Sequence, residues 1–296
     1  NIPEPVLHWD FETSLDGRVV DARGEGQGPS GRLRNGAVLD DGGVHGRSLV
    51  LDGEGAHVEA EDGGVFDSGT DDFTLSMWIK PDERLGQSQL ILFWHGEVGS
   101  GKPQWWIRAE KDGRIRVNMD GGGQVIAAAT EPGQLSVDVW THLAAVREGP
   151  LLNLYINGER VESAGPFEPE QFDYADAGIA PTLGYDKNPN NSRHWSGRID
   201  EVKYYRQALI ADEVRAVYEQ GAAGLSGSSL DAANDSSAGD QSGEADAGED
   251  ESADNRAEQS EAETSAALVA ASLISGFAIL AAAAVWLLRK RRLSIK

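Results

Sequence analysis

The stretch "WSGRIDEVKYYRQAL", residues 195–209, places Asp200, Glu201 and Lys203 in what reads as a β-strand. Side chains alternate between the two faces of a strand, so Asp200 is expected to share a face with Val202 and Tyr204. If that face is buried, the carboxylate needs a fixed partner, because an unpaired buried charge is costly or takes up a proton. An arginine, backbone N–H groups or a Ca²⁺ ion, which prefers oxygen ligands, would each meet this need.

A second group of candidates is aromatic and could stack on sugar rings. These residues are Trp94, Trp105, Trp106, Tyr185 and Trp195. Packing in a core is the alternative for each of them. Because Trp105 and Trp106 are neighbours on one expected strand, they must face opposite ways, and at least one lies outside the core.

Two polar loops are expected to form the rim of a binding site, because loops at the ends of a sandwich tend to carry recognition. They are "HGEVGSGKPQ" (95–104) and "GYDKNPNNSR" (184–193). The predicted ligand-binding residues, which lie in or near these loops or on the strand that follows the first one, are Trp195, His194, Tyr185, Asn190, Asn191 and Trp106.

The elements that must position these residues are mostly strands. "FTLSMWIK" alternates apolar and other side chains, and Asn157-Gly158 and Asp112-Gly113 are hairpin turn signals. Further strands are expected in "VLHWDFE", "SLVLD", "AHVEA", "QLILFW", "QVIAAAT" and "WTHLAAVRE". One helix is predicted in "ALIADEVRAVYEQG", with Ile210, Val214 and Val217 on its apolar face and Gly221 as its stop. Residues 1–221 are therefore predicted to form an all-β, two-sheet antiparallel sandwich with one short C-terminal helix.

The remaining residues predict a membrane anchor. Residues 222–264 carry a net charge of −11 with almost no apolar content, so a disordered acidic stalk is expected. Residues 265–288 hold no charge and would span about 36 Å as a helix, enough to cross a bilayer core of about 30 Å. The basic tail 289–296 is expected in the cytoplasm and residues 1–264 outside. A buried Ala-rich soluble helix is the alternative.

Composition narrows the class of partner. The net charge of −23 argues against a nucleic-acid ligand, and the absence of Cys removes disulfides and thiolate metal sites. The sequence predicts a single-pass protein of the cell membrane, whose N-terminus would be exported by a signal upstream of Asn1 or by a longer chain.

Five motifs in order carry a family resemblance: "HWDFE", "SLVLDGEGAHVEA", "FTLSMWIKP", "WTHLAAVREGPLLNLYINGERV" and "GRIDEVKYYRQALIADEVRAVYEQG". Together they resemble the LamG-like (laminin-G-type, concanavalin A-like lectin/glucanase) domain of bacterial surface proteins. The resemblance implies a jelly-roll sandwich that binds a polysaccharide or glycoconjugate without catalysis. A protein–protein adhesion or scaffold module is the first alternative, and a membrane-tethered glycoside hydrolase is the second.

The resemblance also bears on catalysis and on calcium. Related glucan hydrolases carry Glu-x-Asp-x-Glu on one strand, and no such pattern occurs here, although acids distant in sequence can converge. Many related sandwiches hold a structural Ca²⁺ between the first strand and an Asp on the last. The resemblance therefore implies Asp200, Asp10 and Glu12 as candidate calcium ligands.

Overall fold

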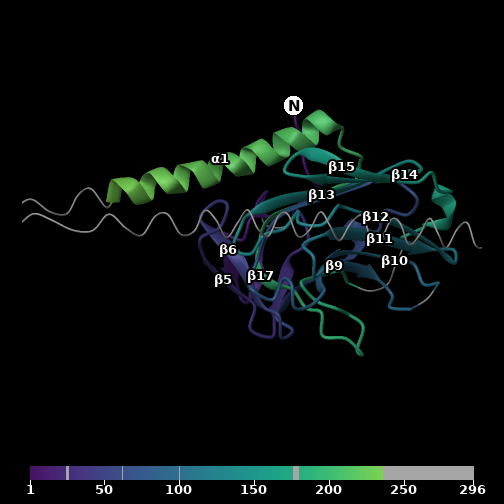
Figure 1. Cartoon of the computed structure of the whole chain (residues 1–296), viewed down its shortest axis with the longest axis horizontal. Helices are drawn as coiled ribbons and strands as arrows, with labels where there is room; N and C mark the ends of the chain where they lie inside the picture. Colours follow the sequence, from purple (N-terminus) through teal and green to yellow (C-terminus); the bar gives the residue numbers. More distant parts are fainter. Residues whose placement is uncertain (25–26, 62, 100, 176–179, 236–296) are drawn as a thin grey trace, which may run out of the picture. The chain divides into compact units, whose positions relative to one another are not determined.

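The computed structural model describes residues 1–24, 27–61, 63–99, 101–175 and 180–235. Within these residues the chain forms two antiparallel sheets that pack face to face, with one α-helix, α1 (Ala211–Asp235), against the outer side of one sheet (Figure 1). This arrangement confirms the predicted two-sheet sandwich. Short 3₁₀ helices occur at Gly63–Phe66 and Pro169–Gln171.

The sheet next to α1, which we call the β8 sheet, has its strands in the following order. They are β15 (Glu159–Ala164), β14 (Leu151–Ile156), β13 (Thr141–Glu148), β8 (Phe73–Pro81), β17 (Ser196–Tyr205), β6 (Arg47–Asp52) and β5 (Val38–Asp41). The first strand, β1 (Leu7–Trp9), pairs with the second half of β17 and so joins the first and last strands of the chain.

The opposite sheet, which we call the β10 sheet, carries the strands that matter most for the site. In order they are β12 (Gln124–Ala129), β11 (Ile115–Gly121), β10 (Gln104–Ala109), β9 (Leu90–Gly96), β16 (Thr182–Leu183), β7 (His57–Ala60), β4 (Gly31–Arg34), β3 (Arg18–Val19) and β2 (Ser14–Leu15).

Turn chemistry accounts for the hairpins. Asn157 and Gly158 have φ of 47° and 80°, and they link β14 to β15 as a two-residue turn, as predicted. Gly122 and Gly123 make the same kind of turn between β11 and β12. Asp112-Gly113 also lies in a hairpin, but in a longer turn between β10 and β11.

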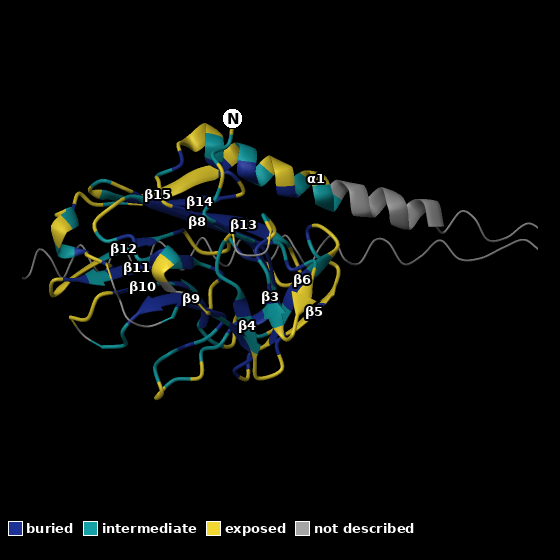
Figure 2. Cartoon of the chain, turned by 180° about the vertical axis from the view of Figure 1, so that it is seen from behind, coloured by how far each residue is buried: buried dark blue, intermediate teal, exposed yellow. Residues whose placement is uncertain are grey.

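The core lies between the sheets and is aromatic at its centre. Phe73 and Met77 from the β8 sheet and Phe93 and Trp105 from the β10 sheet are at most 3% exposed. The Trp105 ring lies 4.7 Å from Phe73 and 4.5 Å from Phe93, measured between ring centroids. Figure 2 shows these inner strands as buried, whereas the edge strand β15 is exposed.

The helix α1 covers a second, smaller apolar cluster on the outer face of the β8 sheet. Val214 and Val217 pack there against Val146 and Tyr155. Ile210, predicted on the apolar face, is instead 60% exposed, because it precedes the helix.

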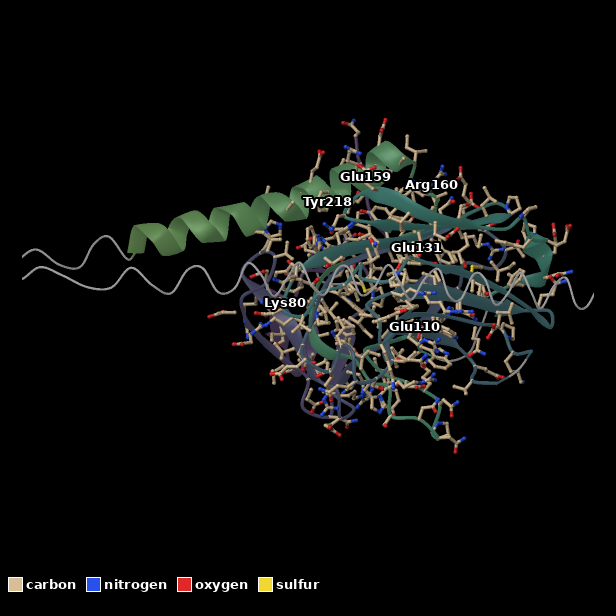
Figure 3. All side chains as sticks on the ribbon, in the orientation of Figure 1. Lys80, Glu110, Glu131, Glu159, Arg160 and Tyr218 are labelled. Carbon is tan, nitrogen blue, oxygen red and sulfur yellow. The ribbon has the colours of Figure 1, made fainter. Side chains whose placement is uncertain are left out.

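The helix does not end at Gly221, where the sequence predicted its stop, but continues to Asp235. Tyr218, labelled in Figure 3, stacks on Trp78 with ring centroids 5.5 Å apart. One turn on, a Cβ on Gly221 would lie 2.3 Å from Nε1 of Trp78. The glycine thus permits close approach of helix and sheet rather than a helix end.

Gly221→Ala is therefore expected to destabilise the protein by about 1–3 kcal/mol, because the new methyl group overlaps the Trp78 ring. In a free helix the same change would stabilise by about 1 kcal/mol. Thermal and urea unfolding would measure the sign. Ala223→Gly on the exposed side of α1 is the control, with an expected loss of about 1 kcal/mol. A stabilised Gly221→Ala variant would show that α1 does not pack on Trp78.

Residues 222–235, predicted as the start of a disordered stalk, belong to α1. The rest of the predicted stalk, the predicted transmembrane helix 265–288 and the tail 289–296 lie outside the described residues. Within the part of the chain that the structure describes, no helix has the length and apolar character needed to cross a membrane.

Candidate functional site

A hollow of about 360 Å³ lies on the outer face of the β10 sheet. Strand register places Trp94 of β9, Trp106 of β10 and Asn118 of β11 side by side across this face. Gln104 and Asp120 form the next cross-strand pair and line the hollow with the two tryptophans. The hollow is thus built on three adjacent strands rather than on loops alone.

The aromatic wall of the hollow consists of Trp94 and Trp106, whose ring centroids are 6.4 Å apart. Trp94 is 5% exposed, whereas Trp106 is partly exposed and Trp105 is in the core. The prediction that Trp105 and Trp106 face opposite ways is confirmed. The guanidinium of Arg108 lies 4.8 Å from the Trp106 ring centroid and is bonded to Glu110, labelled in Figure 3.

The polar wall is organised around Asp120. Each of its carboxylate oxygens accepts one amide hydrogen bond of 2.8 Å, from Gln104 and from Asn118. Burial raises the pKa of Asp120, while the two amides and the charge of Arg116 oppose this rise. Each carboxylate oxygen keeps a lone pair for a further donor.

Two residues that line this hollow each have a buried polar atom without a partner among the described residues. These atoms are Nε1 of Trp94, a donor, and Oε1 of Gln104, an acceptor. Gln104 itself is held in place, because its Nε2 also donates to the carbonyl oxygen of Gly99 over 2.9 Å. Buried polar groups in proteins are nearly always paired, so these two mark a place for a ligand or ordered water.

Both loops predicted as the binding rim meet at this hollow. Val98, Gly99 and Gly101 come from the first loop, and Asn188 comes from the second. The second loop is held by Asp186, whose buried carboxylate accepts hydrogen bonds from the backbone N–H of Asn188 and from the Arg193 side chain. The predicted residues Asn190 and Asn191 lie on this loop, but neither lines the hollow.

The predicted residues Tyr185 and His194 are brought together outside the hollow. Their rings stack with centroids 4.6 Å apart, and His57 packs on the other side at 4.4 Å from Tyr185. Nδ1 of His194 accepts the backbone N–H of Asp186, which ties the stack to the second loop. His57 was not among the predicted residues. It lies on β7, and the sequence does not show that Tyr185, which follows β16, packs beside it.

Trp195 is not a binding residue, contrary to the prediction. Its side chain is 0% exposed and belongs to the core between the sheets. Its backbone N–H donates to the carbonyl oxygen of Gly184, which turns the ring inward from the end of the loop. A ring with no exposed surface cannot stack on a ligand.

Gln104 is the last residue of the first predicted rim loop, although it was not among the predicted ligand-binding residues. Two residues that shape the polar wall were missed: Asp120 and Asn118. A signal for them exists in "RIRVNMD", where Asn118 and Asp120 alternate with the apolar Val117 and Met119. Alternation of this kind indicates polar residues on the outer face of a strand. It does not indicate that neighbouring strands gather them beside a tryptophan.

Residues 52–215 match the family described as the concanavalin A-like lectin/glucanases superfamily. The chain belongs to this superfamily. The matched region begins at the last residue of β6 and ends in α1, so it includes every strand of the hollow. No curated protein matches the chain significantly.

Solved structures with this superfamily fold include bacterial binding domains. The binding domain of Paraclostridial Mosquitocidal Protein 1 has a TM-score of 0.58 at 19% identity, over 73% of this chain and 52% of that one. The receptor binding domain of botulinum neurotoxin C/D mosaic serotype has a TM-score of 0.56 at 14% identity, over 73% and 51%. This chain thus spans about half the length of these toxin domains.

A third similar structure is domain 4 of AbnA, a GH43 extracellular arabinanase from Geobacillus stearothermophilus, in complex with arabinotriose. Its TM-score is 0.54 at 22% identity, over 74% of this chain and 100% of that one. At these identities the likenesses show the shared fold.

Asp200 lies on the opposite face of β17 from the one predicted. It pairs with Trp78, on the outer face under α1, whereas Val202 and Tyr204 are in the core. The register shifts between Asp200 and Lys203, and Glu201 adopts a φ of 51°. This β-bulge inserts one residue, so the simple alternation used for the prediction fails.

The partners of Asp200 are backbone groups. Its Oδ2 accepts the N–H of Val44 and its Oδ1 accepts the N–H of Glu201, each over 2.7 Å. Burial and the charge of Glu201 raise the pKa of Asp200 to about 8, and these backbone donors oppose the rise. The N–H alternative among the predicted partners is therefore the one that the structure contains.

The other candidate calcium ligands also bond to backbone N–H groups. Glu12 accepts from Arg47 over 3.1 Å, and Asp10 accepts from Glu12 over 3.2 Å. In the described part of the chain, no three His, Asp or Glu side chains gather as a metal ion would need. Asp10, Glu12 and Asp200 thus do not form a preformed cluster of carboxylate ligands, and calcium binding stays a prediction.

Proposed function

We propose that this chain is a cell-surface recognition module that binds glycans, without catalysis, in the hollow between Trp94, Trp106 and Asp120. The observation that carries the proposal is the combination of a partly exposed tryptophan, a bonded carboxylate and two unpaired polar atoms in one hollow. Ligand sites typically combine an apolar or aromatic wall with a few convergent polar groups in clefts of about 300–1,000 Å³.

The comparisons support a binding role. The AbnA domain was solved with arabinotriose, and the toxin domains are named as binding or receptor binding domains. We infer a polysaccharide or glycoconjugate as the ligand. The Trp106 ring could stack on a sugar ring, and the polar groups of Asp120 and Gln104 could form hydrogen bonds with its hydroxyl groups. The toxin domains' names, which state binding or receptor binding, also agree with a second candidate, a protein partner that contacts the same two loops.

The polar wall supports binding rather than hydrolysis. Glycoside hydrolases generally use two carboxyl groups about 5–10 Å apart on either side of the scissile bond. Asp120 is the one Asp or Glu that lines the hollow among the described residues, and both of its oxygens are engaged by amides. A membrane-tethered hydrolase would need a second acid from elsewhere.

The proposed location at the membrane depends on the sequence alone. The charge-free segment 265–288 and the basic residues that follow it support a single span with the binding domain outside the cell. Residues between the described domain and that segment would act as an acidic spacer.

Trp106→Ala is expected to weaken retention on a glycan array by about 10- to 100-fold, because stacking on an aromatic ring is worth about 1–3 kcal/mol. The melting temperature should stay nearly unchanged, since the Trp106 ring is partly exposed and outside the core. Ile210→Ala, exposed near the start of α1, is the control and should bind normally. Unchanged binding by Trp106→Ala would refute the hollow as the site.

A further inference from the structure

The charge of the hollow is negative. Asp120 is its one ionisable lining residue, and no Lys or Arg lines it in the described part of the chain. Three cations close to lining residues in sequence are engaged: Arg108 bonds to Glu110, Lys102 pairs with Glu97 over 2.8 Å, and Lys187 donates to the carbonyl oxygen of Ala180 over 2.6 Å. An anionic ligand would thus lie beside the negative carboxylate of Asp120, and no cation that lines the hollow would neutralise the ligand's charge.

The unpaired atoms of Trp94 and Gln104 favour a ligand that both donates and accepts hydrogen bonds. Trp94 offers a donor, while Gln104 and Asp120 offer acceptors. Trp94 and Gln104 are each 5% exposed, so their unpaired atoms have little access to bulk water. A hydroxyl group can satisfy both kinds of partner, whereas a carboxylate or sulfate group only accepts.

We propose that the hollow selects neutral sugars and rejects sugars that carry a carboxylate or sulfate on the bound unit. This inference rests on the proposed function, and it adds the class of glycan. In the proposed complex, sugar hydroxyls donate to the free lone pairs of Asp120 and to Oε1 of Gln104, and one hydroxyl oxygen accepts from Nε1 of Trp94. The sugar ring lies against Trp106.

Arg116 provides the main test of the alternative, in which the hollow binds an anionic sugar. Its charge acts on Asp120, and its Nε is buried without a partner among the described residues, but it does not line the hollow. If an anionic sugar bound here, Arg116 would be its counter-ion. Removal of this charge should therefore matter for an anionic ligand and leave a neutral one unaffected.

The experiment compares the full chain with the variants Asp120→Asn and Arg116→Gln. The probes are the neutral oligosaccharide that binds best on an array and its derivative with the C6 hydroxyl group oxidised to a carboxylate. Isothermal titration should show binding of the neutral probe to the wild type that is tighter by about 10-fold or more, because the carboxylate of the oxidised probe would be buried without a donor to pair it. Arg116→Gln should not change the affinity for the neutral probe.

Asp120→Asn should weaken neutral binding by about 10- to 100-fold, because a hydrogen bond to a charged group is lost, and should bring the two affinities closer together. Equal or tighter binding of the oxidised probe to the wild type would overturn the inference, as would an unchanged ratio in Asp120→Asn. If the oxidised probe binds through Trp106 and Arg116, the proposed function stands and this inference alone fails. Binding of no glycan of either class would overturn both.

Discussion

Trp195→Ala is expected to lower the free energy of unfolding by about 3–5 kcal/mol, one of the largest losses available to a single substitution. The side chain is completely buried between the two sheets, and it is among the largest buried groups of the domain. Its removal leaves a cavity, and the two sheets cannot move together to fill it because strand pairing fixes their backbones. Urea unfolding at a fixed pH would measure the loss.

Two further variants separate a core role from a binding role. Trp195→Phe should cost much less, because it keeps most of the apolar volume and removes only an indole N–H that has no partner among the described residues. Tyr185→Ala, in the partly exposed ring stack beside the second loop, should also cost less than Trp195→Ala. Normal stability of Trp195→Ala with lost glycan binding would restore Trp195 as a binding residue.

The second large effect concerns Asp200 and pH. The contribution of Asp200 to the stability of the folded domain is expected to fall by several kcal/mol as pH rises from the acid range to about 8, where the pKa of its buried carboxyl group lies. The unfolded chain releases this proton near pH 3.8, the ordinary value for the side chain. Because the folded state holds the proton more tightly, its contribution is complete below that pH and is lost as pH passes through 8.

The measurement is the free energy of unfolding of the wild type and of Asp200→Asn between pH 5 and 9. The difference between the two curves isolates Asp200, because the lowered pKa values of buried His95 and His142 raise stability with pH in the acid part of this range. Relative to Asp200→Asn, the wild type should show a loss of stability that is complete by about pH 8. Asp138→Asn, whose side chain is 79% exposed beside Lys80, should retain it. A wild type with the same pH dependence as Asp200→Asn would show that the backbone donors of Val44 and Glu201 hold Asp200 ionised at all these values.

The same series tests calcium. With a bound Ca²⁺ the carboxylate of Asp200 would stay ionised. Added calcium would then suppress the loss of stability that Asp200 causes as pH rises, and a chelator would restore that loss. From the geometry of Asp10, Glu12 and Asp200 we expect equal curves with calcium and with chelator. A chelator-dependent shift that Asp200→Asn abolishes would establish the ion.

Predictions from local pattern succeeded where neighbouring residues decide the outcome. Alternation identified β8, and Asn157-Gly158 identified the β14–β15 turn, because strand faces and turn dihedrals depend on a few adjacent residues. The same rule placed Trp105 and Trp106 on opposite faces. The two rim loops could also be predicted, since polar segments between strands must lie at the surface.

Predictions failed where distant partners decide the outcome. Gly221 reads as a helix stop, but Trp78, far away in the sequence, gives the glycine a packing role. Asp200 was assigned to the wrong face because the bulge in β17 is set where its pairing changes from β6 to β1. Trp195 follows a polar loop, yet its side chain lies in the core, where its backbone N–H bonds to the carbonyl oxygen of Gly184 just ahead of β17.

The sequence by itself determined the class of fold, most strand positions, the two rim loops and the acidic and charge-free segments, because composition and alternation are properties of contiguous residues. Only the tertiary structure decided the site. Trp94, Trp106 and Asp120 come from three strands, and register alone brings them to one face of the β10 sheet. A hollow of this kind depends on which strands are neighbours, and that depends on burial of the whole sandwich core rather than on any local pattern.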